Sequence, residues 1–454
     1  MRLSPAEIAA ALGAEVLAEG EASPPRRAAI DSTAVEPGDL FFGLRGANRD
    51  GGEFAGAALE AEAWGVVVGP AWRSSFVTHR VTKDEGGSWV FAVEDPLAAM
   101  QSLARAWRRA LGAPVVGVTG SVGKTSVKDI ARALLPGRVH ANRENLNTEI
   151  GLPLTLLEAP DDADLLVLEM AMRGTGQIAE LAAIAEPDVA VITNVGPVHV
   201  ELLGSVEAIA AAKAEVLDAL PAAGIAVAPA AAAELEPHLA RAPRLLRFGP
   251  GGDVEAVEAK VAEGVTEAVV RTPAGERTFH FPFAEAHNLT NALAAIAAGV
   301  ALEAPLGEMA DRAANIGFSR FRGERIELGD GIVLVNDCYN ANPVSMRAAL
   351  DHLASLGAPR TIAVLGEMGE LGPGAPGFHR EVGEHARAAG VDLVFGVGLP
   401  ARDYDPDELV ADPGEAAELL VARLGPGDAI LVKGSRSAGL EAVAEALPLL
   451  MESA

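Results

Sequence analysis

Hydrophobic and polar positions divide the chain into three blocks. The first, residues 1 to about 84, mixes short apolar runs with turn signals such as Pro24–Pro25. It opens with a predicted helix, because Ser4 can cap the N-terminus, Pro5 suits the first helical position and Glu7 can complete a capping box. We expect a small α/β domain here.

The second block has the pattern of a parallel α/β sheet. A helix is predicted over 95–111, and the apolar run 115–118 that follows indicates a buried strand. Apolar runs then alternate with helical stretches up to about residue 305, as they do when crossover helices join parallel strands. The later runs are 165–168, 189–193 and 224–227, and the last helix is predicted at 291–302.

The alternation restarts after residues 318–320 and predicts a second, smaller doubly wound sheet. Its strands are expected at 332–335, 361–365, 393–397 and 429–432, and its helices at 345–356, 378–389 and 415–424. The prediction is therefore an α/β protein of three domains, which span residues 1–84, 85–314 and 315–454.

Charge and composition limit the possible partners. The 454 residues carry a formal net charge of −27, which argues against nucleic acid or an anionic membrane as a partner. No apolar run reaches the roughly 18 residues that span a bilayer, and the N-terminus lacks a signal-peptide pattern, so we expect a cytoplasmic protein. The single cysteine, Cys338, rules out an internal disulfide and a multi-cysteine zinc site.

Lysine is rare, at six of the 36 basic residues. A lysine that persists among so many arginines is a candidate for a role that a guanidinium cannot fill, although chance is an equal alternative for any one of them. The six are Lys83, Lys124, Lys128, Lys213, Lys260 and Lys433.

The strongest local signal is the glycine-rich loop Thr-Gly-Ser-Val-Gly-Lys-Thr at 119–125, between a predicted strand and a predicted helix. Such a loop turns backbone N–H groups toward a phosphate, Lys124 can reach the β- and γ-phosphates, and Thr125 can ligate Mg²⁺. The usual motif has glycine where Val118 stands, and a glycine-rich turn with a surface lysine is the alternative. The candidate nucleotide ligands are Gly120, Ser121, Gly123, Lys124, Thr125 and Ser126.

Two further strands lead to candidate site residues, of which Glu169 is a candidate Mg²⁺ ligand. Glu169 follows the run 165–168, and functional groups gather at the carboxyl ends of parallel strands, although an exposed strand-end acid is an alternative. The strand at 189–193 runs into a loop that ends at His199. A lone loop histidine usually has no function, but this loop precedes Lys213 at a spacing that fits a loop and then a helix.

Taken in chain order, the motifs between about residue 30 and residue 445 resemble those of the Mur ligase family of ATP-dependent amide ligases. Its motifs here are TGSVGKT at 119–125, NLNTEIGLP at 145–153, Glu169, TNVGPVH at 193–199, AKAE at 212–215, HNLTNAL at 287–293, RIE at 325–327, NDCYNANP at 336–343, LGEMGELG at 365–372 and VKGSR at 432–436. Three of the last four, at 336–343, 365–372 and 432–436, resemble the member that adds D-alanyl-D-alanine to a UDP-linked muramoyl tripeptide. Thr33, Thr148 and Asn336 depart from the usual Arg, Asn and Asp.

The resemblance implies an N-terminal domain for the UDP end, a central P-loop ATPase domain and a C-terminal Rossmann-like domain. It implies that a substrate carboxylate attacks the γ-phosphate of ATP, and that an amine then displaces phosphate from the acyl phosphate. The expected partners are UDP-MurNAc-tripeptide, D-Ala-D-Ala and ATP, and we expect a monomer.

The resemblance also assigns catalytic roles to Lys124, Glu169, His199 and Lys213. Thr125 and Glu169 are expected to hold a first Mg²⁺, and His199 to help hold a second. Lys213 resembles a family lysine that is carbamylated by CO₂, a reaction that arginine cannot undergo. The alternative for Lys213 is a helix-surface lysine paired with a glutamate.

Further site residues are carried over from the same motifs. Asn291 resembles the adenine-reading asparagine, with Asn288 beside it, and Arg325 and Asp337 resemble residues that close onto phosphate and ribose. The stretch 434–435 is expected to open a helix, which would suit a carboxylate, while caps and turns are alternatives. The candidate substrate ligands are Ser32, Thr33, Asn145, Asn147, Asn340, Asn342, Lys433, Ser435 and Arg436.

Two other interpretations stay open. The chain could be another Mur-type amide ligase that adds a diamino acid or resembles folylpolyglutamate synthase, although the motif at 31–33 disfavours the folate relative. It could also be a nucleotide-binding relative without ligase activity, which the complete set of candidate catalytic residues disfavours. The sequence does not identify the third residue of the tripeptide.

Overall fold

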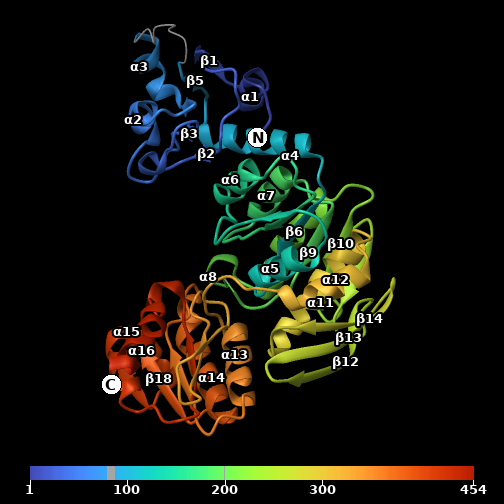
Figure 1. Cartoon of the computed structure of the whole chain (residues 1–454), viewed down its shortest axis with the longest axis vertical. Coiled ribbons are helices and arrows are strands. Elements are labelled where there is room, and N and C mark those ends of the chain that lie inside the picture. The colour runs from blue at the N-terminus through green and yellow to red at the C-terminus, as the bar shows by residue number, and fades with distance from the viewer. Residues whose placement is uncertain (79–86, 199, 454) are drawn as a thin grey trace.

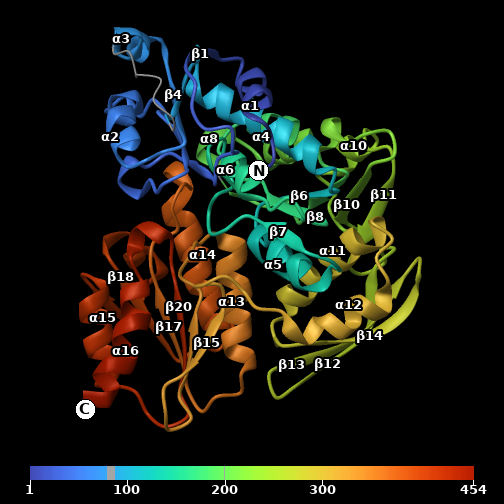
Figure 2. The same cartoon turned by 45° about the horizontal axis from the view of Figure 1, so that its top comes forward.

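The computed structural model describes residues 1–78, 87–198 and 200–453, which fold into three domains in chain order. In the view of Figure 1 the central domain lies between the other two. The tilted view in Figure 2 shows the N-terminal domain above the C-terminal domain, with the central domain at the right. Within these residues, no helix combines the length and the apolar character needed to cross a membrane.

The N-terminal domain is built on a five-stranded sheet of order β1-β5-β4-β3-β2, in which only the edge strand β1 is antiparallel. The predicted capping box at Ser4 and Glu7 is present at the first helix. The elements are α1 (Pro5–Leu12), β1 (Glu15–Ala18), β2 (Ala28–Ala29), β3 (Leu40–Phe42), α2 (Ala55–Glu60), β4 (Gly65–Val68), α3 (Arg73–Thr78) and β5 (Trp89–Ala92).

The last strand of this sheet lies beyond the predicted domain boundary. Strand β5 pairs with β1 and β4, so the boundary expected after residue 84 precedes the end of the sheet. The pairing with β1 joins residues some seventy positions apart in the chain, as in Val16 opposite Phe91. A local hydrophobic pattern carries no information about such a partner, and this is why the boundary was placed too early.

The central domain contains a six-stranded, fully parallel sheet of order β11-β10-β9-β6-β8-β7. One face packs on α5 and α11, and the other packs on α4, α6 and α7 in a core shared with the N-terminal domain. The elements are α4 (Pro96–Leu111), β6 (Val115–Thr119), α5 (Lys124–Leu134), β7 (Val139–Ala141), α6 (Gly151–Glu158), β8 (Leu165–Glu169), α7 (Gln177–Ala185), β9 (Val189–Ile192), α8 (Val200–Leu203), α9 (Val206–Lys213), β10 (Ile225–Pro229), α10 (Glu236–Leu239), β11 (Leu245–Phe248), α11 (Ala286–Ala301) and α12 (Leu306–Arg312).

A three-stranded antiparallel sheet interrupts the parallel pattern that was predicted for this block. It comprises β12 (Glu255–Ala262), β13 (Val265–Thr272) and β14 (Gly275–Phe281) in that order. Buried and exposed residues alternate along β13, because one face of the sheet is solvated while the other covers the core. The expectation of a purely parallel arrangement was therefore wrong between β11 and α11.

The C-terminal domain is a second doubly wound sheet of order β15-β16-β20-β17-β18-β19, with only β15 antiparallel. The four predicted strands and three predicted helices are all present, while β15, β19 and α16 were not predicted. The elements are β15 (Glu324–Glu327), β16 (Val333–Asn336), α13 (Pro343–Ser355), β17 (Thr361–Leu365), α14 (Ala375–Ala388), β18 (Leu393–Val397), β19 (Glu408–Val410), α15 (Pro413–Val421), β20 (Ala429–Lys433) and α16 (Glu441–Ser453).

Residues 434–435 do not open a long helix, contrary to the prediction. They lead into the three-residue 3₁₀ turn η8 (Arg436–Ala438), and α16 begins only at Glu441. Gly439, which has a φ of 63°, ends the turn in a left-handed conformation that glycine adopts without strain. A turn of this length has only a small dipole, so the argument for carboxylate binding at a helix N-terminus loses its basis.

Candidate active site

A cavity of about 310 Å³ lies where the central and C-terminal domains meet. It opens at the carboxyl ends of β6, β8, β16 and β20, where doubly wound sheets bind their ligands. Twelve of the predicted site residues line it, namely Ser121, Gly123, Lys124, Thr125, Ser126, Glu169, Asn288, Asn291, Asp337, Asn340, Asn342 and Lys433.

The glycine-rich loop forms the floor of this cavity between β6 and α5. Gly123 has a φ of 80°, and a Cβ atom there would lie 2.4 Å from Oδ1 of Asn291. The two residues that follow β9 hold this loop in place. Val122 N donates to Asn194 Oδ1 at 2.9 Å, and Thr193 Oγ1 donates to Val122 O at 2.5 Å. Only glycine fits at position 123, and the loop is rigidly placed for a phosphate.

The residues expected to hold a first Mg²⁺ are in contact. Thr125 Oγ1 donates to Glu169 Oε2 at 2.8 Å, and both residues are buried. A hydroxyl and a carboxylate suit Mg²⁺, which takes few protein ligands and completes its shell with phosphate and water. Asn147, predicted as a substrate ligand, instead donates to Glu169 Oε1 at 2.8 Å.

The described residues contain no group of three or more His, Cys, Asp or Glu side chains able to hold a metal ion by themselves. His199, the candidate ligand for a second ion, lies outside the described residues. The first site therefore fits the hydroxyl–carboxylate pair together with the phosphates of a nucleotide.

Lys213 is buried at the end of α9, with 2% of its surface exposed. Its Nζ donates to Gly120 O at 2.9 Å, and burial together with the charge of Lys124 lowers the pKa of Lys213 well below its usual value. Glu215, the nearby glutamate, instead accepts hydrogen bonds from the backbone N–H groups of Gly176 and Ala179. The alternative of a surface Lys–Glu pair is wrong.

Arg322 contributes to the cavity and was missed in the sequence. Its Nη2 donates to Thr125 Oγ1 at 3.3 Å, and its guanidinium lies 4.0 Å from the ring centroid of Tyr339. Arg325, the predicted arginine, is half exposed, donates to Glu327 at 2.8 and 3.0 Å and does not line this cavity. The sequence around Arg322 shows only an arginine followed by a glycine at the end of the interdomain connection. This dipeptide is too common to identify a site residue.

At the start of α11 the predicted adenine-binding residues form a short hydrogen-bond chain. Asn291 Nδ2 donates to Asn288 Oδ1 at 3.3 Å, and Asn288 Nδ2 donates to Glu285 Oε2 at 3.4 Å. The neighbouring His287 lines the cavity, and burial lowers its pKa.

The C-terminal candidates divide into cavity groups and structural groups. Lys433 Nζ pairs with Asp337 Oδ2 at 2.6 Å and also donates to Asn340 O at 3.1 Å, all within the cavity. Asn342 caps α13, because its Oδ1 accepts from the N–H groups at 344 and 345. Its side-chain oxygen therefore serves the predicted alternative role of a helix cap.

The VKGSR candidates beyond Lys433 make local contacts. Ser435 Oγ accepts from Gly369 N at 2.8 Å, and Arg436 pairs with Glu441 at 3.1 Å. Ser435 thereby joins this loop to the LGEMGELG segment at 365–372. Neither Ser435 nor Arg436 lines the cavity.

The N-terminal candidates lie in the loop between β2 and β3, away from this cavity. Ser32 and Thr33 belong to the 3₁₀ turn η1 (Ser32–Ala34), and Asp31 Oδ1 accepts from both N and Oγ1 of Thr33. Asp39, which has no exposed surface, pairs with the two arginines that precede β2.

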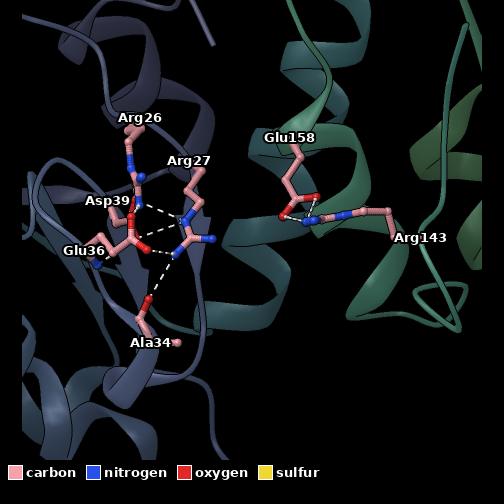
Figure 3. Close-up of polar contacts among 7 residues, drawn as sticks. All are labelled: Arg26, Arg27, Ala34, Glu36, Asp39, Arg143 and Glu158. Carbon is pink, nitrogen blue, oxygen red and sulfur yellow. Dashed lines mark hydrogen bonds and ion pairs between the residues drawn. The ribbon is translucent and has the colours of Figure 1, made fainter.

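Figure 3 shows Arg26 and Arg27 directed at Asp39 and, across from them, Arg143 paired with Glu158 of α6 at 2.6 Å. Arg143 lies near Asn145 in the chain, whose backbone oxygen accepts from Asn147 N. Figure 3 thus shows two arginines of the N-terminal domain on one side and Arg143 of the central domain on the other.

Comparison with known proteins identifies the family. The Mur ligase middle domain matches residues 118–299, and the Mur ligase, glutamate ligase domain matches residues 321–436. A UDP-N-acetylmuramoyl-tripeptide--D-alanyl-D-alanine ligase of Synechocystis is 38% identical over 92% of this chain and 90% of its own. The chain belongs to the Mur ligase family.

Two solved Mur ligase structures share the three-domain fold. MurF from Acinetobacter baumannii superposes with a TM-score of 0.88 at 26% identity and 99% coverage of both chains. MurF ligase from Thermotoga maritima, solved in complex with ADP, superposes with a TM-score of 0.81 at 31% identity, covering 94% of this chain and 98% of its own. The three-domain α/β fold predicted from the sequence is confirmed.

Proposed function

We propose that this Mur ligase joins D-alanyl-D-alanine to UDP-N-acetylmuramoyl-tripeptide at the expense of ATP. The observation that carries the proposal is the cavity between two domains, in which Lys124, the Thr125–Glu169 pair and Arg322 face one space. Cationic groups from both sides of a phosphate site are what phosphoryl transfer between anions requires. The relatives that match nearly the whole chain carry the same activity in their names.

In the proposed reaction, a terminal carboxylate oxygen of the tripeptide bonds to the γ-phosphorus of ATP, and the bond to the ADP oxygen breaks. The amine of D-Ala-D-Ala then attacks the acyl carbon, phosphate leaves with the bonding electrons, and the amine loses its proton. Lys124 and the N-terminus of α5 bind the transferring phosphate, and Arg322 approaches it from the connection between the central and C-terminal domains. When bound, Mg²⁺ at Thr125 and Glu169 would neutralise charge on the phosphates.

We also propose that Lys213 is carbamylated. An amine reacts with CO₂ only when it is neutral, and burial beside Lys124 favours the neutral form of Lys213. The nitrogen bonds to the carbon of CO₂ and loses a proton, which leaves a carboxylate-like anion. This anion would support a second Mg²⁺, together with His199.

The substrate expectations are tested by phosphate release from ATP. We expect release with UDP-MurNAc-tripeptide to depend on D-Ala-D-Ala, and a diamino acid or glutamate offered in its place to give none. Release that depends on a diamino acid would overturn the assignment, and no release with any acceptor would favour a non-catalytic relative. We further propose that the protein is cytoplasmic, because its substrates are a nucleotide sugar and ATP. We also propose that it is a monomer, which the elution volume of the pure protein tests.

A further inference from the structure

A series of buried polar groups connects the metal-site residue Glu169 with the interdomain linker, residues 316–323. Its centre is Lys128 and Asp129 on α5, which are 2% and 4% exposed. Their charged groups lie 3.2 Å apart. Neither residue lines the cavity, and the proposed reaction does not use them.

At one end, Lys128 holds the segment that positions Glu169. Lys128 Nζ donates to Asn142 O at 3.0 Å, and Asn142 Oδ1 accepts from Glu169 N at 2.5 Å. Asn142 Nδ2 also donates to Glu169 O at 3.4 Å. The backbone of Glu169 is thereby fixed relative to α5 through one buried amide.

At the other end, Asp129 holds the linker. Its Oδ2 accepts from Ser319 N at 2.8 Å and from Ser319 Oγ at 2.7 Å. Three residues further along the linker, Arg322 donates to Thr125. Thr125 and Asp129 are four residues apart and so lie on one face of α5. The linker therefore follows the phosphate-binding helix, with a polar contact at each of two successive turns.

Burying two charges is expensive, and an apolar pair of the same volume would serve stability equally well. This buried pair instead holds two parts of the site in position, because Lys128 is linked to the backbone of Glu169 and Asp129 is bonded to the linker. We propose that Lys128 and Asp129 are positioning residues that lock the linker to the phosphate-binding helix. This lock places Arg322 of the linker at Thr125 and sets the angle at which the C-terminal domain lies against the central domain.

The test compares Ser319→Ala, Ser319→Thr and Asp129→Asn with the matched control Asp428→Asn. Asp428 is also a buried carboxylate, paired with Arg360 in the C-terminal domain and outside the cavity. We expect Ser319→Ala to lower kcat about tenfold, the size of one hydrogen bond to a charged group. The KM for the tripeptide should stay unchanged, and Ser319→Thr should restore kcat.

A second readout needs no turnover. With a non-hydrolysable ATP analogue and Mg²⁺, scattering should give a larger radius of gyration for Ser319→Ala and Asp129→Asn than for the wild type. Asp428→Asn should lose thermal stability while keeping the wild-type radius. Wild-type kcat and radius in Ser319→Ala, or an Asp129→Asn protein that behaves like Asp428→Asn, would overturn the proposal. The activity readout rests on the proposed function, whose failure would show as an inactive wild type, whereas the scattering comparison would still decide the positioning role.

Discussion

Two lysines share one backbone acceptor in the glycine-rich loop. Lys124 Nζ and Lys213 Nζ each donate to Gly120 O at 2.9 Å. Burial, the largest effect, lowers the pKa of both lysines. The charge of Lys124 lowers the pKa of Lys213 further, whereas Glu169 raises and Arg322 lowers that of Lys124. The more buried Lys213 is the one expected to give up its proton, while Lys124 regains a counter-charge when a phosphate binds.

The carbamate proposal makes a specific prediction for Lys213. If the working group is an anion, Lys213→Ala and Lys213→Arg should both be nearly inactive, although arginine keeps the positive charge. Acetate at high concentration should partly restore Lys213→Ala by occupying the vacated anion position. The measurement is phosphate release by both variants with and without acetate, and an active Lys213→Arg would remove the carbamate from the mechanism.

Lys124→Ala should abolish ATP turnover while the fold stays intact. The ammonium group is expected to stabilise the transferring phosphoryl group, and loss of such a contact lowers the rate by ~10³ or more. Lys260→Ala is the matched control, because Lys260 is exposed on β12 and outside the cavity. A Lys124→Ala protein with half the wild-type kcat would be incompatible with a phosphate-binding role.

At the scale of elements, the sequence predicted those parts whose signal is local. Buried parallel strands appear as apolar runs, and the phosphate loop is a contiguous motif, so both were found. The sheet β12–β14 escaped because its alternating pattern lies between two parallel strand–helix units and is only half apolar. Arg322 escaped because its role depends on how the linker lies against α5, and no local pattern encodes that contact.

The loop between β2 and β3 depends on one buried carboxylate. Asp39 accepts from Arg26 Nε at 3.0 Å, from Arg27 Nε at 3.1 Å and from Glu36 N at 3.0 Å, and Arg27 also donates to Ala34 O. These contacts, drawn in Figure 3, hold the loop that carries the candidate substrate ligands Ser32 and Thr33.

Asp39→Asn should therefore loosen this loop. We expect the KM for the UDP-linked substrate to rise about tenfold, equivalent to roughly 1.4 kcal/mol, with kcat nearly unchanged. The free energy of unfolding should fall by about 2 kcal/mol, because two arginines lose their partner. Glu53→Gln, which breaks the exposed pair with Arg49, is the control and should cost at most ~1 kcal/mol. A lowered kcat with an unchanged KM would contradict the assignment.

At the scale of the whole molecule, one polar contact between the central and C-terminal domains involves a histidine. His352 of α13 lies 3.4 Å from Glu285 at the start of α11, and both side chains are largely buried. Burial, the largest effect, lowers the pKa of His352 from its usual 6.5, while Glu285 partly raises it and Arg325 lowers it further. His287 in the same junction is shifted in the same direction by burial.

The arrangement in which the two domains are in contact at this junction, called closed below, therefore favours neutral histidines, and this fixes the sign of its pH dependence. Above the usual pKa of 6.5 both the open and the closed states hold neutral histidine, and the full contact free energy is present. As the pH falls below that value, the open state binds protons more readily than the closed one, and closure weakens. We expect the radius of gyration of the nucleotide-loaded protein to grow between about pH 7.5 and about pH 5.5.

His352→Gln should flatten this response, because glutamine keeps a polar group at the junction without a proton to bind. His140→Gln is the matched control: His140 is also a histidine whose pKa burial lowers, but it lies in the central domain against Thr155 O. Its replacement should change the pH dependence of unfolding and leave the response of the radius intact. If both variants retain the full change in radius, His352 does not control closure. If His140→Gln abolishes it as well, the acid response reports unfolding of the central domain and not the separation of two folded domains.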